Sequence, residues 1–325
     1  MERGSGPRPS SLSSINCFGE FCADEGTCTS ASVKCHLVPP KTNNVPVKSV
    51  IEIIMPLEHE ESLPVSSSRS PVFCHEQEEF FGRVIEVMGR NHVQVAVAGA
   101  FAVHEHTGIW RATKDIDLFL PAQEAPRALK LLEKAGFTTE IMDPVWLAKV
   151  RQGGHFVDLI AGMSNAVIRV DYSWIKRARP CELFGTQMRV LAPEELIASK
   201  VFVARRERFD GADICHIIYG TKGSFEWCRL MHLVGEHWEM LFWYLVLYHY
   251  TYPAHSDYVP REIWDELLQR FTVELRHPNI NMKFRGSLID DKMFAIDVAE
   301  WGQRSILEEQ RQAADVIERA DRTGT

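Results

Sequence analysis

Hydrophobic and polar residues follow periodic patterns along the chain, and each period predicts an element. From residue 77 apolar side chains recur every three or four positions, which predicts an amphipathic helix. A second helical pattern covers 125–135 and ends at Gly136. Short apolar or alternating runs at 93–98, 115–120, 137–142 and 155–160 have strand length. This alternation of strands and helices predicts an α/β layer.

The pattern changes to mostly helical further along the chain. A Pro-Glu-Glu start predicts a helix over 193–206, and we expect Asp210 to cap the next helix. Residues 224–276 are predicted to be helical, and the apolar run 240–250 is too short to cross a bilayer. We therefore interpret that run as a buried core helix. Aromatic residues in this region are expected to pack in the core, with a base-stacking surface as the alternative: Trp227, Trp238, Phe242, Trp243 and Tyr244.

Composition and charge narrow the class of protein. The chain has 325 residues, of which 45% are hydrophobic and 25% charged, enough for one substantial core and a smaller unit. The net charge of −8 argues against a broad surface that coats nucleic acid, although a local basic rim remains compatible with it. The eight cysteines show no paired metal spacing, so we interpret them as free thiols. The chain starts without a charged and apolar leader, which predicts a cytoplasmic protein that does not bind membranes.

Three segments follow from the shifts in composition. Residues 1–74 are rich in Ser and Pro, and we expect a disordered or poorly ordered tail. Residues 75–222 contain the strand and helix alternation, and residues 223–325 form the helical C-terminal region.

Carboxylates on two predicted strands are the strongest chemical signal. Asp115 and Asp117 are separated by one residue, so a strand points both to the same face. Hard cations such as Mg²⁺ prefer such oxygen ligands together with substrate phosphates. A turn at Gly99-Ala100 precedes a predicted helix, and helix starts offer free backbone N–H groups to phosphate. Asp158 lies in the middle of the apolar strand 155–160, where an acid needs a metal or another partner.

These residues resemble the signature of the DNA polymerase beta-like nucleotidyltransferases, in the branch of minimal nucleotidyltransferases and AbiE-type toxins. That signature is a hydrophobic residue, Gly, then Gly or Ser, a helix, and an Asp-hydrophobic-Asp pair about a dozen residues later. Here Ala98-Gly99-Ala100 matches the first part and Asp115-Ile116-Asp117 the second. The resemblance extends from about residue 80 to about 220, and it implies a small mixed sheet flanked by helices.

The resemblance also implies roles for individual residues. Asp115, Asp117 and Asp158 would bind Mg²⁺, with two ions expected, and Asp158 would take the proton of the attacking hydroxyl. Asp171 is the competing candidate for the third carboxylate. The nucleotide would contact the backbone of the turn and several side chains, for which solvated surface positions are the alternative: Gly99, Ala100, Arg111, Thr113, Lys114 and Lys200.

The implied reaction is transfer of a nucleoside monophosphate from an NTP to a hydroxyl acceptor, with release of pyrophosphate. The sequence leaves open whether the acceptor is tRNA, a protein or a small molecule. Ala100 stands where the family has Gly or Ser, which keeps a second hypothesis open, namely a catalytically retired module that binds nucleotide or RNA. A third hypothesis is an interaction scaffold that uses the aromatic C-terminal helices.

Overall fold

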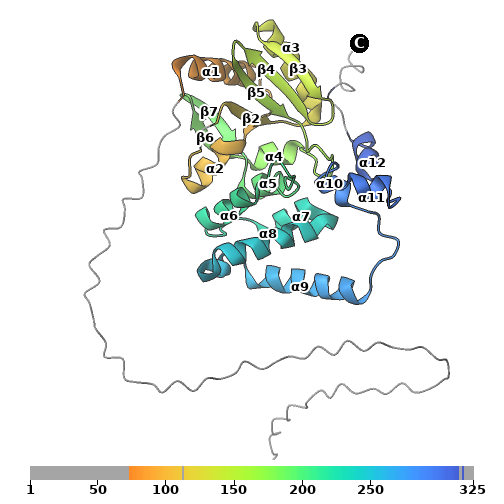
Figure 1. The fold of residues 1–325 in the computed structure, drawn as a ribbon. Helices are drawn as coiled ribbons and strands as arrows, with labels where there is room; N and C mark the ends of the chain where they lie inside the picture. Colours follow the sequence, from red (N-terminus) through yellow and green to blue (C-terminus); the bar gives the residue numbers. More distant parts are fainter. Residues whose placement is uncertain (1–72, 112, 315–316, 318–325) are drawn as a thin grey trace, which may run out of the picture. The chain divides into compact units, whose positions relative to one another are not determined.

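The strands form one mixed sheet, as Figure 1 shows for the computed structural model, which describes residues 73–111, 113–314 and 317. The predicted tail, residues 1–74, lies outside the described residues except for its last two. Within the described residues the sheet has seven strands in the order β3-β4-β5-β2-β1-β7-β6. The strands are β1 (Ala96–Val97), β2 (Asp115–Phe119), β3 (Thr138–Asp143), β4 (Leu147–Gln152), β5 (His155–Ile160), β6 (Arg179–Leu183) and β7 (Thr186–Val190).

The sheet contains both parallel and antiparallel pairs of strands. Strand β2 pairs in parallel with β5, and β1 pairs in parallel with β7. The remaining neighbours, β3-β4, β4-β5, β1-β2 and β6-β7, are antiparallel. The predicted fold class, a mixed α/β structure with helices on the sheet, is therefore confirmed.

One face of the sheet is covered by helices α1 (His75–Arg90) and α3 (Ala125–Lys134). Apolar residues at alternate positions of β2 and β5 point to this face and are fully buried, because period-two alternation sends them all the same way. These residues pack with the apolar stripe of α1 into one cluster, which includes Ile116, Leu118, Val157, Leu159, Phe81 and Val84.

The opposite face packs on a second, larger core cluster. Phe119 and Ile160 point to this side, where Phe119 stacks on the ring of Trp174 at a centroid distance of 6.0 Å. Three short helices lie here, namely α4 (Tyr172–Arg177), α5 (Pro193–Ala198) and α6 (Gly211–Gly220), and α2 (Gly99–Thr107) packs on α6. The cluster continues into the C-terminal helices, so one core runs across the predicted boundary at residue 222.

The C-terminal region is helical, as the sequence predicts. It contains α7 (Trp227–Val234), α8 (Trp238–Thr251), α9 (Arg261–Arg276), α10 (Gly286–Ile289), α11 (Ala295–Ala299) and α12 (Leu307–Gln312), with short 3-10 turns at Gly235–His237 and Pro253–Tyr258. Another 3-10 turn, Ala122–Glu124, lies between β2 and α3. Helix α8 buries Leu241 and Tyr244, whereas Trp243 is 47% exposed. Within the described part of the chain, no helix has the length and apolar character to cross a membrane.

The predicted helix over 193–206 is too long. Helix α5 ends at Ala198, and the chain then turns so that the ammonium group of Lys200 points into the protein. Strands β4, β6 and β7 are absent from the sequence prediction, because the polar and charged residues in them leave only a weak apolar signal. Both β4 and β6 form tight hairpins, with β5 and β7 respectively.

Candidate functional site

Strand register brings the predicted carboxylates together. Asp117 of β2 and Asp158 of β5 are Cα partners in the parallel pair, and Asp115 faces Phe156 two positions earlier. Because side chains alternate along a strand, Asp115, Asp117 and Asp158 all point to the same face. The three carboxylates interact electrostatically with one another. The described structure therefore places the three predicted acids in one group.

The turn at Gly99 lies directly against Asp117. Gly99 has a φ of +57°, and a Cβ atom added there would lie 1.9 Å from Oδ2 of Asp117. The N–H of Ala98 donates to the carbonyl of Asp117 at 2.9 Å, which holds this turn on β2. In α2 the N–H of Ala102 closes the first turn on the carbonyl of Ala98. The N–H groups of α2 before Ala102 have no partner within the helix, so they are available to a ligand that binds beside the carboxylates.

The local field is strongly negative at Asp117. Burial raises its pKa to about 6, and the charges of Asp115 and Asp158 add to this effect, against the opposing charge of Lys200. Asp115 accepts a hydrogen bond of 2.5 Å from the hydroxyl of Thr113. A buried carboxylate that is short of positive charge is a suitable ligand for a divalent cation.

Asp158 has a partner that the sequence reasoning missed. Its Oδ1 lies 2.5 Å from the ammonium Nζ of Lys149, and both side chains are only 15% exposed. Burial raises the pKa of Asp158, although Lys149 acts in the opposite direction. The ammonium also lies over the Phe156 ring, 4.0 Å from its centroid. The sequence did contain a signal for this pair. The two-residue turn Gly153-Gly154 between β4 and β5 sets the register in which Lys149 lies opposite Asp158.

Lys200 binds carboxylates and is buried. Its Nζ lies 2.8 Å from Oδ2 of Asp210 and 2.8 Å from Oδ2 of Asp213. All three residues are only 5–8% exposed. Arg208 donates to both oxygens of Asp210, at 2.9 and 3.0 Å. Burial raises the pKa of Asp210, but Arg208 and Lys200 outweigh this effect and keep that pKa low. Asp210 occupies the N-cap position of α6, as predicted, but its carboxylate makes no cap hydrogen bond and pairs with these cations instead.

Two of the remaining predicted nucleotide contacts, Arg111 and Thr113, pair with carboxylates of this region. Arg111 forms an ion pair with Asp213, and about half of its side chain is exposed. Thr113 binds Asp115, Lys114 is exposed, and Ala100 is half-buried in the first turn of α2. The competing acid Asp171 instead caps α4, where it accepts the N–H of Ser173 at 2.7 Å.

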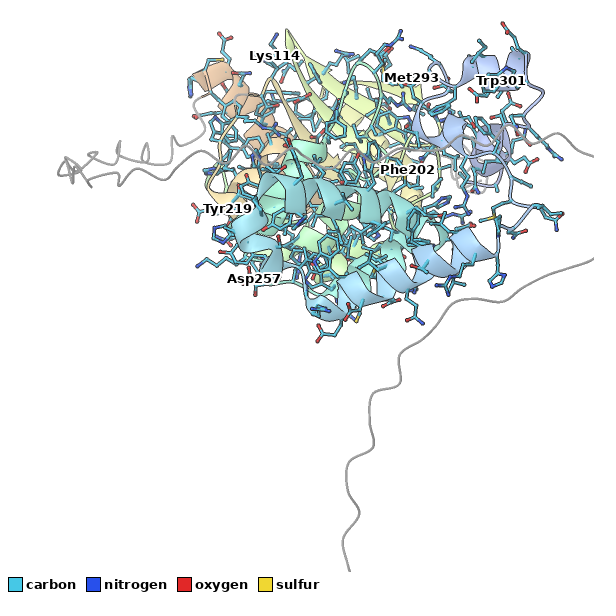
Figure 2. All side chains as sticks on the ribbon, turned by 60° about the horizontal axis from the view of Figure 1, so that its bottom comes forward. Lys114, Phe202, Tyr219, Asp257, Met293 and Trp301 are labelled. Carbon is cyan, nitrogen blue, oxygen red and sulfur yellow. The ribbon has the colours of Figure 1, made fainter. Side chains whose placement is uncertain are left out.

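A cavity of about 240 Å³ opens over the carboxylates. Asp117, Asp158 and Gly99 line one part of it, and Arg205 and Arg208 line another. Its apolar wall is formed by aromatic and aliphatic side chains that the sequence did not single out, including Phe119, Trp146, Met163 and Phe202. Phe202 lies near the middle of the molecule in Figure 2, whereas Lys114 lies at its periphery.

Part of the chain matches a known family in sequence. Residues 77–226 match the family described as "Nucleotidyl transferase of unknown function (DUF2204)". This segment contains every strand of the sheet and all the residues of the site described above. The match supports the nucleotidyltransferase superfamily for this segment and leaves the toxin-like branch untested. No curated protein is similar enough in sequence to match the chain.

Several solved structures share low similarity with the chain. An antigenic nucleotidyltransferase-like protein from Paracoccidioides brasiliensis has 17% identity and a TM-score of 0.37, over 58% of this chain and 94% of its own. The antibiotic-resistance factor ANT(2'')-Ia has 16% identity and a TM-score of 0.34, over 55% of this chain and 94% of its own. The lincosamide antibiotic adenylyltransferase LnuA, solved with lincomycin bound, has 15% identity and a TM-score of 0.32, over 44% and 95%.

Proposed function

We propose that the protein is a metal-dependent nucleotidyltransferase, which transfers a nucleoside monophosphate from an NTP to a hydroxyl acceptor and releases pyrophosphate. The proposal rests on one observation, the register that places Asp117 beside Asp158 on the sheet face that also presents Asp115. The family match of residues 77–226 supports the same reaction class. We further propose a cytoplasmic location.

Asp115 and Asp117 would hold Mg²⁺, and Asp158 would complete a site for a second ion. The residues fit a divalent cation, because the carboxylate of Asp117 is partly buried beside two like charges and Gly99 leaves no Cβ over it. When bound, the cation neutralises phosphate charge and polarises the reacting phosphate. Thr113 fixes the orientation of Asp115 through its hydroxyl. The cation must displace a proton from Asp117 where that carboxyl is protonated, so its raised pKa of about 6 weakens cation binding at lower pH.

Asp158 is suited to receive the proton of the attacking hydroxyl. Its raised pKa makes it a stronger base than an ordinary carboxylate, and it lines the cavity where an acceptor would enter. Lys149 holds one oxygen of Asp158 and leaves the other to face the cavity or a ligand. Lys149 is therefore a positioning residue in this proposal.

The nucleotide phosphates would bind at the start of α2. Gly99 lies against Asp117, and the N–H groups of Gly99 and Ala100 belong to the start of α2, which adds partial positive charge. Arg111 and Lys114 supply positive charge from the connection before β2. Lys200 lines the cavity but already binds two carboxylates, so it would act on the nucleotide chiefly through the local field.

A second candidate function is nucleotide binding without turnover. Two observations favour it. Ala100 lacks the hydroxyl that a serine would offer, and the ammonium of Lys149 already balances part of the charge at Asp158. In that case the cavity would bind an NTP in a metal-dependent way, and no pyrophosphate would form.

Incubation of the full chain with Mg²⁺ and each α-labelled NTP separates these functions. RNA, protein and small-molecule fractions are then analysed for label, and pyrophosphate is measured. The enzyme predicts label in one fraction with equimolar pyrophosphate, and loss of both in Asp117→Ala. Asp257→Ala is the matched control, because this exposed aspartate lies on a turn of the helical region (Figure 2). Binding without pyrophosphate indicates the second function, and the absence of metal-dependent binding contradicts both.

A further inference from the structure

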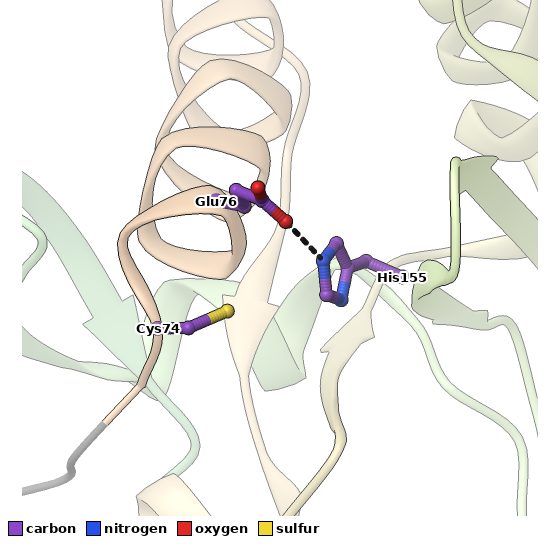
Figure 3. A group of neighbouring side chains, drawn as sticks. All are labelled: Cys74, Glu76 and His155. Carbon is purple, nitrogen blue, oxygen red and sulfur yellow. Dashed lines mark ion pairs between the residues drawn. The ribbon is translucent and has the colours of Figure 1, made fainter.

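Three metal-binding side chains converge on the opposite face of the sheet from the carboxylates. Cys74 precedes α1, Glu76 lies in its first turn, and His155 is the first residue of β5 (Figure 3). One ligand atom from each lies within 4.8 Å of the other two. Nε2 of His155 lies 4.0 Å from Oε2 of Glu76.

The position of this group separates it from the proposed catalytic site. His155 and Asp158 are an odd number of residues apart on β5, so their side chains point to opposite faces of the sheet. Residues on the His155 face pack beneath α1, and Phe80 of α1 lies 6.3 Å from the His155 ring, centroid to centroid. The group therefore joins the start of α1 to the strand that supplies Asp158.

The donor set matches one class of ion. A thiolate, an imidazole and a carboxylate are the ligands that zinc and similar borderline transition metals prefer, whereas Mg²⁺ and Ca²⁺ prefer oxygen alone. Ligand atoms around tetrahedral zinc are about 3.5 Å apart, so small side-chain rotations would close the present spacing. Cys74 and Glu76 are exposed, and the Cys74 side chain also faces the N–H of Gln77 in the capping box of α1.

Charge and access also suit a bound cation. A thiolate and a carboxylate balance a divalent ion, and the partial positive charge at the start of α1 favours both anions. His155 has a fixed position, because the Gly153-Gly154 turn pairs it with Gln152. A cavity of about 270 Å³ beside the group is lined by Glu76 and His155, which leaves room for a fourth ligand such as water.

We propose that Cys74, Glu76 and His155 form a zinc-type metal site with one open position. Binding converts the Cys74 thiol to a thiolate, and its proton passes to solvent. The ion links α1 to β5 and so stabilises the sheet face on which α1 packs. This site is independent of the proposed nucleotidyl transfer.

Co²⁺ added to the metal-stripped full chain tests the proposal, because a cobalt–thiolate bond gives a charge-transfer absorption band. We expect the band to saturate near one equivalent in the parent chain and to be lost in Cys74→Ser. Cys228→Ser is the matched control, since Cys228 is also an exposed free thiol and lies on α7. The chain has eight cysteines, so dependence on Cys74 is the decisive result.

A second measurement does not depend on sulfur. Zn²⁺ should raise the midpoint of thermal unfolding of the parent chain, and His155→Gln should weaken Zn²⁺ binding by more than about 100-fold. His232→Gln, at an exposed position on α7, should keep the response. A cobalt band that persists in Cys74→Ser, a parent chain without a band, or a Zn²⁺ response unchanged in His155→Gln would overturn the proposal.

Discussion

The backbone of Gly99 lies against the carboxylate of Asp117 so closely that no side chain fits between them. A Cβ atom at Gly99 would lie 1.9 Å from Oδ2 of Asp117, and the φ of +57° already favours glycine. The first turn of α2 and the carboxylate of β2 are therefore one unit, in which a change on either side moves the other.

Gly99→Ala should remove metal-dependent nucleotide binding, because the new methyl group displaces the Asp117 carboxylate. The control is Gly108→Ala, since Gly108 also has a positive φ, of +72°, but has nothing within 4 Å of its Cβ position. Both variants pay about 1–2 kcal/mol for the left-handed backbone. Only Gly99→Ala should lose NTP binding, measured by calorimetry with Mg²⁺. Equal NTP affinity in the two variants would contradict the role of this close approach.

Asp117→Asn should stabilise the metal-free protein above pH 6 while it abolishes label transfer. The pKa of Asp117 is raised from 3.8 to about 6 in the folded chain, so the folded state holds its proton more tightly than the unfolded state. Protonated Asp117 therefore contributes its full stabilisation of the folded state below about pH 3.8, and this stabilisation is lost as pH rises through about 6. Above that pH the gain from the neutral amide is up to about 3 kcal/mol.

Urea unfolding in the presence of EDTA measures this difference as a function of pH. The gap between Asp117→Asn and the parent chain should widen from about pH 3.8 to about pH 6 and level off above that pH. Asp257→Asn, at an exposed position away from the carboxylates, serves as the control. A gap that narrows with increasing pH would show that Asp117 is not held in a protonated form by burial.

Lys149→Met should shift the acidic limb of the pH–rate profile to higher pH. Lys149 opposes the effect of burial on the pKa of Asp158, so removal of its ammonium lets that pKa rise further. Lys149→Arg keeps a cation beside the carboxylate and should restore most of the profile. The measurement is label transfer across a pH series at saturating NTP. If Lys149→Met and Lys149→Arg give the same profile, Lys149 does not act through the charge on Asp158.

Lys200→Met should destabilise the fold by about 3–5 kcal/mol, because it leaves Asp210 and Asp213 buried without that partner. Lys283→Met is the matched control, since Lys283 forms an exposed ion pair of 2.7 Å with Glu309 and should cost about 0–1 kcal/mol. Urea unfolding gives both values. Similar small losses for the two variants would show that Lys200 is not structural, and would favour the direct phosphate contact predicted from the sequence.

The strands around the acids were predictable because their side chains alternate with period two. That alternation placed Asp115 and Asp117 on one face, and the residue ranges of β2 and β5 agree closely with the sequence prediction. The hydrophobic stripe of α1 was equally readable from its spacing. These features are local, so a window of a few residues contains all the information that decides them.

Tertiary structure alone decided which distant groups became partners. The pairing of β2 with β5 is parallel and spans about forty residues, and no local pattern specifies that Asp117 faces Asp158. Lys200 turns inward because it pairs with Asp213 of α6 and with Asp210 at the start of that helix. Local periodicity does not reveal these partners, so the sequence predicted a continuous helix through residue 206, whereas α5 stops at Ala198. Burial, which sets the pKa of Asp117, likewise arises only when the two core clusters close around the sheet. Sequence determined the elements and the chemistry available on them, and long-range packing determined which of those groups share a site.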